Sequence, residues 1–193
     1  MNQTIYTKRL ILRKFERSDI KDIYKIFSDI DTNRFLPWYP LKSEIDAERF
    51  YKERYAEVYC MDSGYAYAVC LKEDNVPIGY INVSLDESYD LGYGLLPSFR
   101  GIGIMSEAVE AVLCRLKTDG LQYVTATHDV NNPRSGEVMK RVGMTYRYSY
   151  REFWEPKNFW VTFRLYQINF DVNDTFLYSG YSDRNGNFFI ENI

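Results

Sequence analysis

The sequence predicts an α+β fold, with helices flanking a central mixed sheet whose strands run mostly antiparallel. Three observations support this prediction. Between residues 64 and 96, three short β-like runs are joined by turns too short for anything but antiparallel neighbours. A long amphipathic segment follows at about 102–118. Beyond it, strand-like and helix-like segments follow one another, which favours helices packed on a sheet.

The first half of the chain opens with an alternating run at 9–15, which predicts a strand. Two amphipathic helices are expected next, with Ser18 and Ser43 as their N-caps. Between them lies an aromatic loop, RFLPWYP, at residues 34–40. The three antiparallel strands are expected at 65–71, 78–85 and 89–96.

The second half begins with the long helix, which Gly120 is expected to end. After it we expect a strand at 122–128, a helix at 132–143 and two strands near 144–153 and 159–169. Residues 1–170 are therefore expected to form one domain, followed by a C-terminal extension, residues 171–193. Two aromatic runs flank the turn sequence DRNG in this extension, which predicts a hairpin. We expect it to pack on the domain or to pair across a homodimer, because it would otherwise leave an exposed sheet edge.

Composition excludes several classes of protein. The 193 residues are 46% hydrophobic and 26% charged, which is typical of a globular domain with a core. A net charge of −3 argues against a nucleic-acid partner. No signal peptide or run of 18 apolar residues is present, so we expect a cytoplasmic protein without a membrane partner. The three cysteines are widely spaced, which favours reduced thiols and no metal site.

The most informative stretch is SFRGIGIMSEA, residues 98–108, between an expected strand and the long helix. Gly101 and Gly103 leave bare backbone where the helix begins, and its N–H groups there suit phosphate oxygens. A tight turn without a ligand is one alternative. A dinucleotide site is another, because GIGIMS is close to G-x-G-x-x-G. The intervening LPSF and the hairpin-like turns before it argue against that alternative.

At these residues the chain resembles the GNAT superfamily of acetyl-CoA-dependent N-acetyltransferases. The segment from Arg100 to Met105 matches the motif R/Q-x-x-G-x-G/A except at its last position. RGIGIMSEA is especially similar to the RimJ/RimL-like branch, which acetylates the N-termini of ribosomal proteins. Further similar segments extend the resemblance over roughly residues 6–169, namely TKRLILRKFERSDI, RFLPWYP, VPIGYINVS, NNPRSGEVMKRVGM and YREFW.

The resemblance implies the GNAT fold, acetyl-CoA as cosubstrate and no metal. It implies that the coenzyme pyrophosphate lies on the loop N–H groups and that the pantetheine arm pairs with the preceding strand where the sheet is splayed. A backbone N–H there would stabilise the oxyanion. The cofactor-binding residues expected on this basis are Tyr93, Gly94, Leu95, Leu96, Arg100, Gly101, Ile102, Gly103, Ile104, Met105 and Asn132.

The resemblance also implies catalytic residues. Met139 stands where many members carry an acidic tyrosine, whereas Ser135 matches the serine proposed as the acid in the ribosomal-protein branch. An N-cap of the 132–143 helix is the alternative role for Ser135. For the base we expect Glu155, with Glu152 as the neighbouring carboxylate and a solvated loop charge as the alternative. We expect His128, the one histidine, to be structural.

The implied acceptor is a primary amine. Neutralising a lysine at neutral pH costs about 3.5 kcal/mol more than neutralising an α-amine, which favours a protein N-terminus. An antibiotic, polyamine or amino acid derivative is the alternative acceptor. Since Met139 replaces the tyrosine, a non-catalytic acyl-CoA-binding protein is the alternative from another class. Trp38 and Tyr39, in the aromatic loop, are expected to bind the acceptor.

Overall fold

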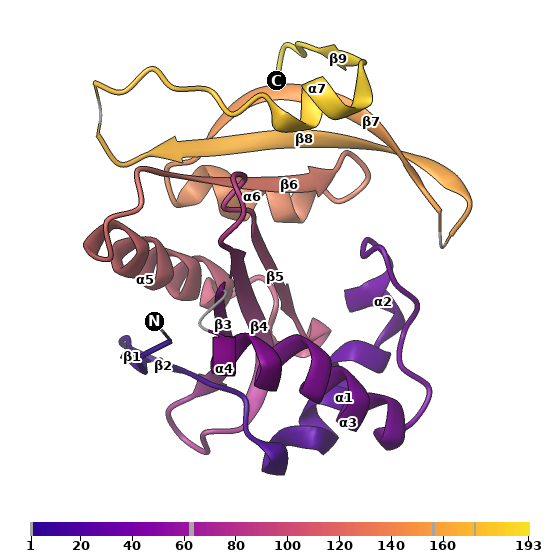
Figure 1. Cartoon of the computed structure of the whole chain (residues 1–193). Helices are drawn as coiled ribbons and strands as arrows, with labels where there is room; N and C mark the ends of the chain where they lie inside the picture. Colours follow the sequence, from indigo (N-terminus) through magenta and orange to yellow (C-terminus); the bar gives the residue numbers. More distant parts are fainter. Residues whose placement is uncertain (1, 62–63, 156, 172) are drawn as a thin grey trace.

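The computed structural model describes residues 2–61, 64–155, 157–171 and 173–193, and it arranges their strands in two sheets (Figure 1). The larger sheet has the order β1-β2-β3-β4-β5, and all its neighbouring strands are antiparallel. Its strands are β1 (Ile5–Tyr6), β2 (Leu10–Arg13), β3 (Gly64–Leu71), β4 (Pro77–Ser84) and β5 (Leu91–Leu95). The smaller sheet, ordered β6-β8-β7-β9, is also antiparallel. It contains β6 (Tyr123–Asp129), β7 (Thr145–Trp154), β8 (Phe159–Asn169) and β9 (Phe188–Phe189).

The helices cover the sheets and fill the space between them (Figure 1). They are α1 (Ile20–Ser28), α2 (Ile30–Asn33), α3 (Glu44–Tyr51), α4 (Glu57–Met61), α5 (Ile104–Thr118), α6 (Pro133–Arg141) and α7 (Gly180–Asn185). A π-helical segment at Lys52–Ala56 joins α3 to α4, so the second predicted helix is continuous in space. None of the helices in the described ranges combines the length and apolar character needed to cross a bilayer.

The α+β class is confirmed, but the single mixed sheet is divided in two. One isolated parallel bridge, between Asp90 and Thr125, joins the sheets. The Thr125 N–H donates to the carbonyl oxygen of Tyr89 over 3.3 Å at the same place. Past this point the two strands diverge: β5 continues to pair with β4, and β6 continues to pair with β8. The separation between β5 and β6 opens the site described below.

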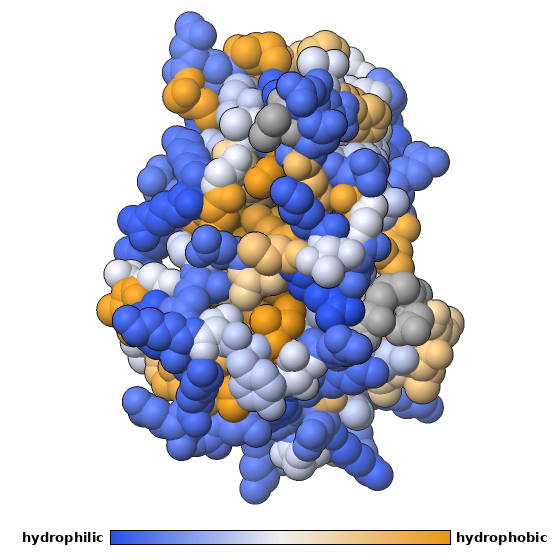
Figure 2. Space-filling model, turned by 90° about the vertical axis from the view of Figure 1, so that its left-hand side faces the viewer, coloured by the Kyte–Doolittle hydropathy of each residue, from blue (hydrophilic) through white to orange (hydrophobic). Residues whose placement is uncertain are grey.

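The hydrophobic core has two main parts. One lies between α5 and the two sheets, and α5 buries Ile104, Ala108, Val112 and Leu116 in it. The other lies beneath α1 and α3, where aromatic rings such as those of Phe27 and Tyr80 stack. Figure 2 shows the side of the molecule on which α5 lies, where hydrophobic side chains gather in the middle between hydrophilic borders. The larger sheet is therefore packed between α5 on one face and α1 and α3 on the other.

The two predicted N-caps have different outcomes. Ser43 is confirmed, because its side chain accepts a hydrogen bond from the Asp46 N–H at the start of α3. The prediction for Ser18 is wrong, since this residue lies inside a 3-10 turn, Arg17–Asp19, and α1 begins after it. Asp19 accepts from the Glu16 N–H and pairs with Arg13 at 2.7 Å. The Asp19 carboxylate thus fixes the helix entry that was expected of Ser18.

The predicted C-terminal hairpin is also wrong. The DRNG sequence ends helix α7, and Gly186, with φ of +64°, is its left-handed C-cap residue. The following aromatic pair forms β9 and aligns with β7, with Phe188 opposite Tyr150 and Phe189 opposite Ser149. The extension therefore packs on the domain of its own chain, while the homodimer stays a prediction.

Candidate active site

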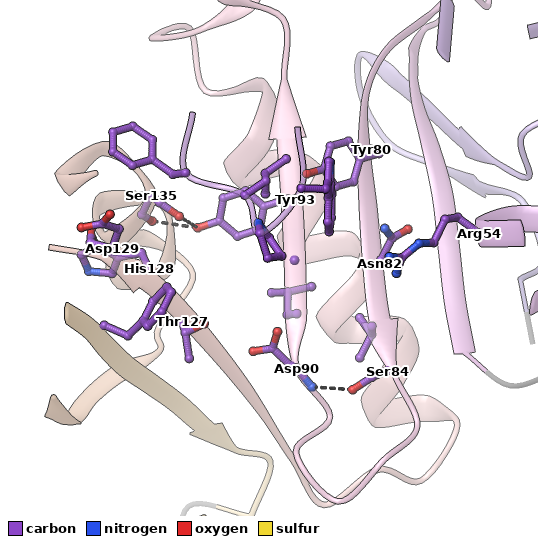
Figure 3. A pocket seen from close by; sticks show the side chains of 18 of the residues that line it. Arg54, Tyr80, Asn82, Ser84, Asp90, Tyr93, Thr127, His128, Asp129 and Ser135 are labelled. Atoms are coloured by element: carbon purple, nitrogen blue, oxygen red, sulfur yellow. Dashed lines mark hydrogen bonds between the residues drawn. The ribbon is translucent and has the colours of Figure 1, made fainter. Parts of the chain in front are cut away.

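The separation of β5 from β6 leaves a cavity of about 640 Å³ (Figure 3). Its walls come from β4, β5 and β6, from α6 and β7, and from the segment after α1. The C-terminal extension also contributes a residue, Tyr181. Residues from distant parts of the sequence thus meet where the larger sheet faces the smaller one.

The edge of β5 presents backbone groups toward this cavity. Asp90 and Leu96 exchange backbone hydrogen bonds with β4, through Ser84 N–H to Asp90 O and Leu96 N–H to Ile78 O. Because backbone groups alternate in direction along a strand, those of Tyr93 and Leu95 point to the opposite side, where β6 diverges. The Arg100 Nε donates to the Leu95 carbonyl there over 3.0 Å. An extended chain containing amides can pair with such an edge.

The glycine loop has the shape of an anion-binding helix start. Gly101 and Gly103 have φ of +83° and +78°, values that other residues rarely adopt, and Gly103 is the N-cap residue of α5. A Cβ at Gly101 would meet no atom within 4 Å, so the backbone there is open to approach. Arg9 supports the loop by donating to the Ile102 carbonyl over 2.8 Å. These N–H groups fit a pyrophosphate, as the positive end of a helix favours negative charge.

Ser135 and Tyr93 form a hydrogen-bonded pair across the cavity. The Ser135 Oγ donates to the Tyr93 hydroxyl over 3.1 Å, and that hydroxyl donates to the Ser135 carbonyl over 2.7 Å (Figure 3). Asn132, not Ser135, occupies the N-cap position of α6, so the alternative role for Ser135 is wrong. Burial raises the pKa of Tyr93 and keeps its hydroxyl protonated at neutral pH. Two hydroxyl groups, hydrogen-bonded to each other, therefore lie at the cavity wall.

Four acidic residues line the cavity, Glu53, Asp90, Asp129 and Glu152, and the pKa values of Asp90 and Glu152 are raised. The pKa of Asp90 is raised to about 7, chiefly by burial and also by the charges of Asp86 and Glu152, while a hydrogen bond from Tyr181 lowers it. No described residue donates to the Asp90 Oδ1, which is buried. Burial likewise raises the pKa of Glu152. A carboxyl that titrates near neutrality in a cavity suits a general base.

Comparison with known proteins assigns the family. The acetyltransferase (GNAT) domain model matches residues 9–145, which is more than half of the chain. This chain belongs to the GNAT acetyltransferase family. It is an acetyl-CoA-dependent N-acetyltransferase, and the extension lies outside the matched residues.

Three known proteins are similar to this GNAT acetyltransferase in sequence or fold. The uncharacterized N-acetyltransferase YnaD of Bacillus subtilis is 30% identical over 144 residues, which are 72% of this chain and 81% of YnaD. A GNAT-family acetyltransferase from Bacillus anthracis superimposes with a TM-score of 0.75 at 26% identity, over 86% of this chain and 98% of its own. An acetyl transferase from Salmonella typhimurium, which modifies the N-terminal serine of ribosomal protein L7/L12, gives 0.74 at 18% identity, over 88% and 100%. The last likeness concerns the fold alone.

The structure of this GNAT acetyltransferase separates the two carboxylates proposed as bases. Strand β7 places Tyr150, Glu152 and Trp154 in the cavity wall, because alternate side chains share one face. Glu155 follows the end of β7, is exposed and does not line the cavity. The expectation that Glu155 is the base therefore disagrees with the geometry, which favours Glu152 and Asp90.

The two candidate residues of the aromatic loop also differ in whether they line the cavity. Trp38 lines the cavity, and Arg54 lies over its ring at 5.3 Å. Tyr39 is 61% exposed and is not part of the cavity wall. Consecutive residues of this Pro-bounded loop thus face different surroundings, and of the two residues expected to bind the acceptor, Trp38 is the one that lines the cavity.

His128 is buried in the wall beside α6. Its Nδ1 donates to the Asp129 carbonyl over 2.8 Å, so its Nε2 carries a lone pair. No described residue donates to this Nε2, and burial lowers the pKa of the imidazole. A Cβ at Gly136 would lie 2.6 Å from Nε2, so the nitrogen faces the backbone of α6 at close range. This packing agrees with the structural role expected of His128.

Sequence reasoning missed Asp90 and Tyr181. Asp90 was treated only as part of the predicted strand at 89–96. Its acidic side chain, at the start of the strand that leads to the glycine loop, could have marked it as a candidate site residue. Tyr181 carried no such signal, because only tertiary packing brings the extension to the cavity. Across the described ranges, no three His, Cys, Asp or Glu side chains converge as metal ligands would.

Proposed function

We propose that this enzyme acetylates the α-amine of a protein or peptide N-terminus, with Asp90 as its general base. The observation that carries the proposal is the Asp90 carboxyl, which lines the cavity beside the edge of β5 and has a pKa raised to about 7. In the proposed mechanism this carboxyl acts together with the glycine loop that binds acetyl-CoA, the edge of β5 and the Ser135–Tyr93 pair.

The residues present fit acetyl-CoA. The loop from Arg100 to Met105 would hold its pyrophosphate through backbone N–H groups, since Gly103 has no side chain to cap them. The outward backbone groups of Tyr93 and Leu95 would pair with the amides of the pantetheine arm. Gly94 lets β5 lie close to Tyr80, because a Cβ there would come within 2.4 Å of the Tyr80 ring. Asn132 lines the cavity at the start of α6 and would contact the same arm.

Acetyl-CoA supplies a thioester: the amine nitrogen bonds to the acetyl carbon, the carbon–sulfur bond breaks and the coenzyme leaves as its thiol. Asp90 accepts the proton that the amine loses. Ser135, hydrogen-bonded to Tyr93, provides the proton that the leaving sulfur needs. A backbone N–H on the outward edge of β5 stabilises the negative oxygen that develops on the acetyl group. Solvent returns the Asp90 proton to the Ser135–Tyr93 pair, so the enzyme ends unchanged.

The pKa of Asp90 favours an α-amine over a lysine as the acceptor. An α-ammonium has a pKa of roughly 7.7–8.0, so passing its proton to a carboxylate with a pKa of about 7 costs on the order of 1 kcal/mol. A lysine, with a pKa of about 10.4, would cost on the order of 4–5 kcal/mol. The fold likeness to the Salmonella enzyme, which acts on an N-terminal serine, agrees with this choice.

An acceptor panel tests the proposal. Wild-type protein is assayed with acetyl-CoA and three acceptors: a peptide with a free α-amine, the same peptide blocked at its N-terminus but carrying a lysine, and spermidine. We expect acetylation of the free α-amine at a kcat/KM at least tenfold above the other two. A preference for spermidine would assign a small-molecule amine instead, and a preference for the lysine would contradict the pKa argument.

Asp90→Asn tests the base with the same peptide. Because the amide cannot accept the proton, we expect kcat to fall by about 100-fold or more, with acetyl-CoA affinity unchanged. Asp90→Glu, which keeps a carboxyl, should retain more activity than the amide. An Asp90→Asn enzyme as active as wild type would remove Asp90 from the mechanism.

A further inference from the structure

The C-terminal extension is fixed firmly to the sheet that forms one wall of the cavity. Glu191 pairs with Arg164 of β8, with Oε2 2.6 Å from Nη2. The Gln167 side chain accepts from the Tyr178 N–H over 3.0 Å, and the Tyr148 hydroxyl donates to the Tyr178 carbonyl over 3.0 Å. Figure 1 shows α7 and β9 lying along β7 and β8. These bonds hold α7 in one position relative to the cavity.

In this position, helix α7 contributes Tyr181 to the cavity wall. The Tyr181 ring lies parallel to the Tyr150 ring, with centroids 5.1 Å apart and 2° between the planes. Both rings line the cavity together with Asp90 and Glu152. The guanidinium of Arg184, one turn further along α7, also lies over the Tyr181 ring, 5.1 Å from its centroid. Tyr181 thus contacts both an aromatic ring and a cation.

The Tyr181 hydroxyl interacts with Asp90. The hydrogen bond from Tyr181 lowers the pKa of Asp90, against burial and the charges of Asp86 and Glu152, which raise it. Burial, followed by the charge of Asp90, raises the pKa of Tyr181, while a hydrogen bond with Ser88 lowers it, so the Tyr181 hydroxyl stays protonated and can donate. The titratable groups that act on Asp90, or on which it acts, are Asp86, Tyr93, Tyr150, Glu152 and Tyr181.

We propose that the extension, residues 171–193, completes the active site of the 1–170 domain, and that Tyr181 is the positioning residue through which it orients the Asp90 carboxyl. This proposal rests on the proposed function, in which Asp90 is the base. Tyr181 does not touch the reacting atoms. Its ring closes the wall against Tyr150, and its hydroxyl holds the carboxylate in the orientation that receives the amine proton.

Tyr181→Phe in the full chain tests the proposal, because it keeps the stacked ring and removes the hydroxyl alone. The measurement is kcat/KM against pH, with an acceptor amine already neutral at pH 6, beside the affinity for acetyl-CoA. We expect the acidic limb of the profile to move upward by at least half a pH unit and kcat at pH 7 to fall at least twofold. Acetyl-CoA affinity should stay within twofold of wild type, since the donor loop is distant in the fold.

Tyr178→Phe is the matched control. Tyr178 belongs to the same extension and also carries a hydrogen-bonded hydroxyl, which accepts from Arg184 over 3.0 Å, but it does not line the cavity. A purely structural role of the extension predicts equal effects of the two substitutions. The proposal predicts that only Tyr181→Phe moves the acidic limb.

Two outcomes separate this proposal from the one on which it rests. If Asp90→Asn is inactive while Tyr181→Phe and Tyr178→Phe both follow the wild-type profile, the role of Tyr181 is wrong and Asp90 remains the base. If Asp90→Asn keeps wild-type activity, the proposed base is wrong and the role of Tyr181 falls with it.

Discussion

The side chains of Ser135 and Tyr93 are joined by a hydrogen bond of 3.1 Å that spans from α6 to β5. The Tyr93 hydroxyl donates its own hydrogen bond to the Ser135 carbonyl, so the serine Oγ–H points at an oxygen that is already a donor elsewhere. Met139, which stands where the family resemblance places an acidic tyrosine, is buried in the core. In the proposed mechanism the acid therefore depends on two residues from different elements.

We predict that Ser135→Ala and Tyr93→Phe each lower kcat by about 10- to 100-fold, because the leaving sulfur loses its proton donor or the donor loses its partner. Ser135→Thr keeps the hydroxyl and should restore most of the rate. Single-turnover acetyl transfer to a peptide measures the chemical step directly. If both hydroxyl deletions leave that step at the wild-type rate, the sulfur departs without help from this pair.

We predict that Gly103→Ala weakens acetyl-CoA binding at least tenfold in calorimetric titration. The added methyl group covers the helix N–H groups and strains a residue whose φ is +78°. Gly120→Ala is the matched control: φ is +92° there, a Cβ meets no atom within 4 Å, and the residue lies beyond the other end of α5. Equal losses in the two variants would mean that backbone strain, and not the loop, accounts for the effect.

Much of this fold could be predicted from local patterns. The strands, the long helix and the glycine loop follow from alternation, helical spacing and the positive φ that Gly101 and Gly103 adopt. Division into two sheets could not be predicted, because it depends on which distant strand β6 selects as its partner. The prediction of a C-terminal hairpin was wrong for a similar reason. Gly186 serves equally well in a hairpin turn and at a helix end, and packing on β7 decides between them.

The residues of the site also differ in whether they are neighbours in the sequence or only in the folded chain. The donor loop is contiguous in sequence, so its residues could be named in advance. Asp90, Glu152 and Tyr181 come from three separate segments, and only the folded chain brings them to one cavity. Glu152 and Glu155 look alike in the sequence, and only the structure shows that Glu152 lies on the cavity face of β7 while Glu155 follows the strand end.

We predict that activity rises with pH through about 7, because the Asp90 carboxyl accepts a proton only when ionised. With a pKa of about 7 it is roughly one-tenth ionised at pH 6 and nine-tenths at pH 8. The unfolded chain ionises this carboxyl near pH 4, so the raised pKa also makes the free energy of unfolding fall between about pH 4 and pH 7. Denaturant unfolding of wild type and Asp90→Asn over this range measures that slope. Identical slopes would mean that Asp90 titrates in the folded protein as it does in the unfolded chain.

We predict that Glu152→Gln and Glu155→Gln differ, although the two glutamates are three residues apart. The charge of Glu152 raises the pKa of Asp90, so removing it should move the acidic limb of the kcat/KM profile to lower pH. Glu155 is exposed and outside the cavity, so Glu155→Gln should leave the profile unchanged. A weakly basic acceptor, neutral at pH 6, keeps the amine itself from titrating during the measurement. The opposite pattern, in which only Glu155→Gln lowers kcat, would return the base to Glu155 and require the turn after β7 to move toward the cavity.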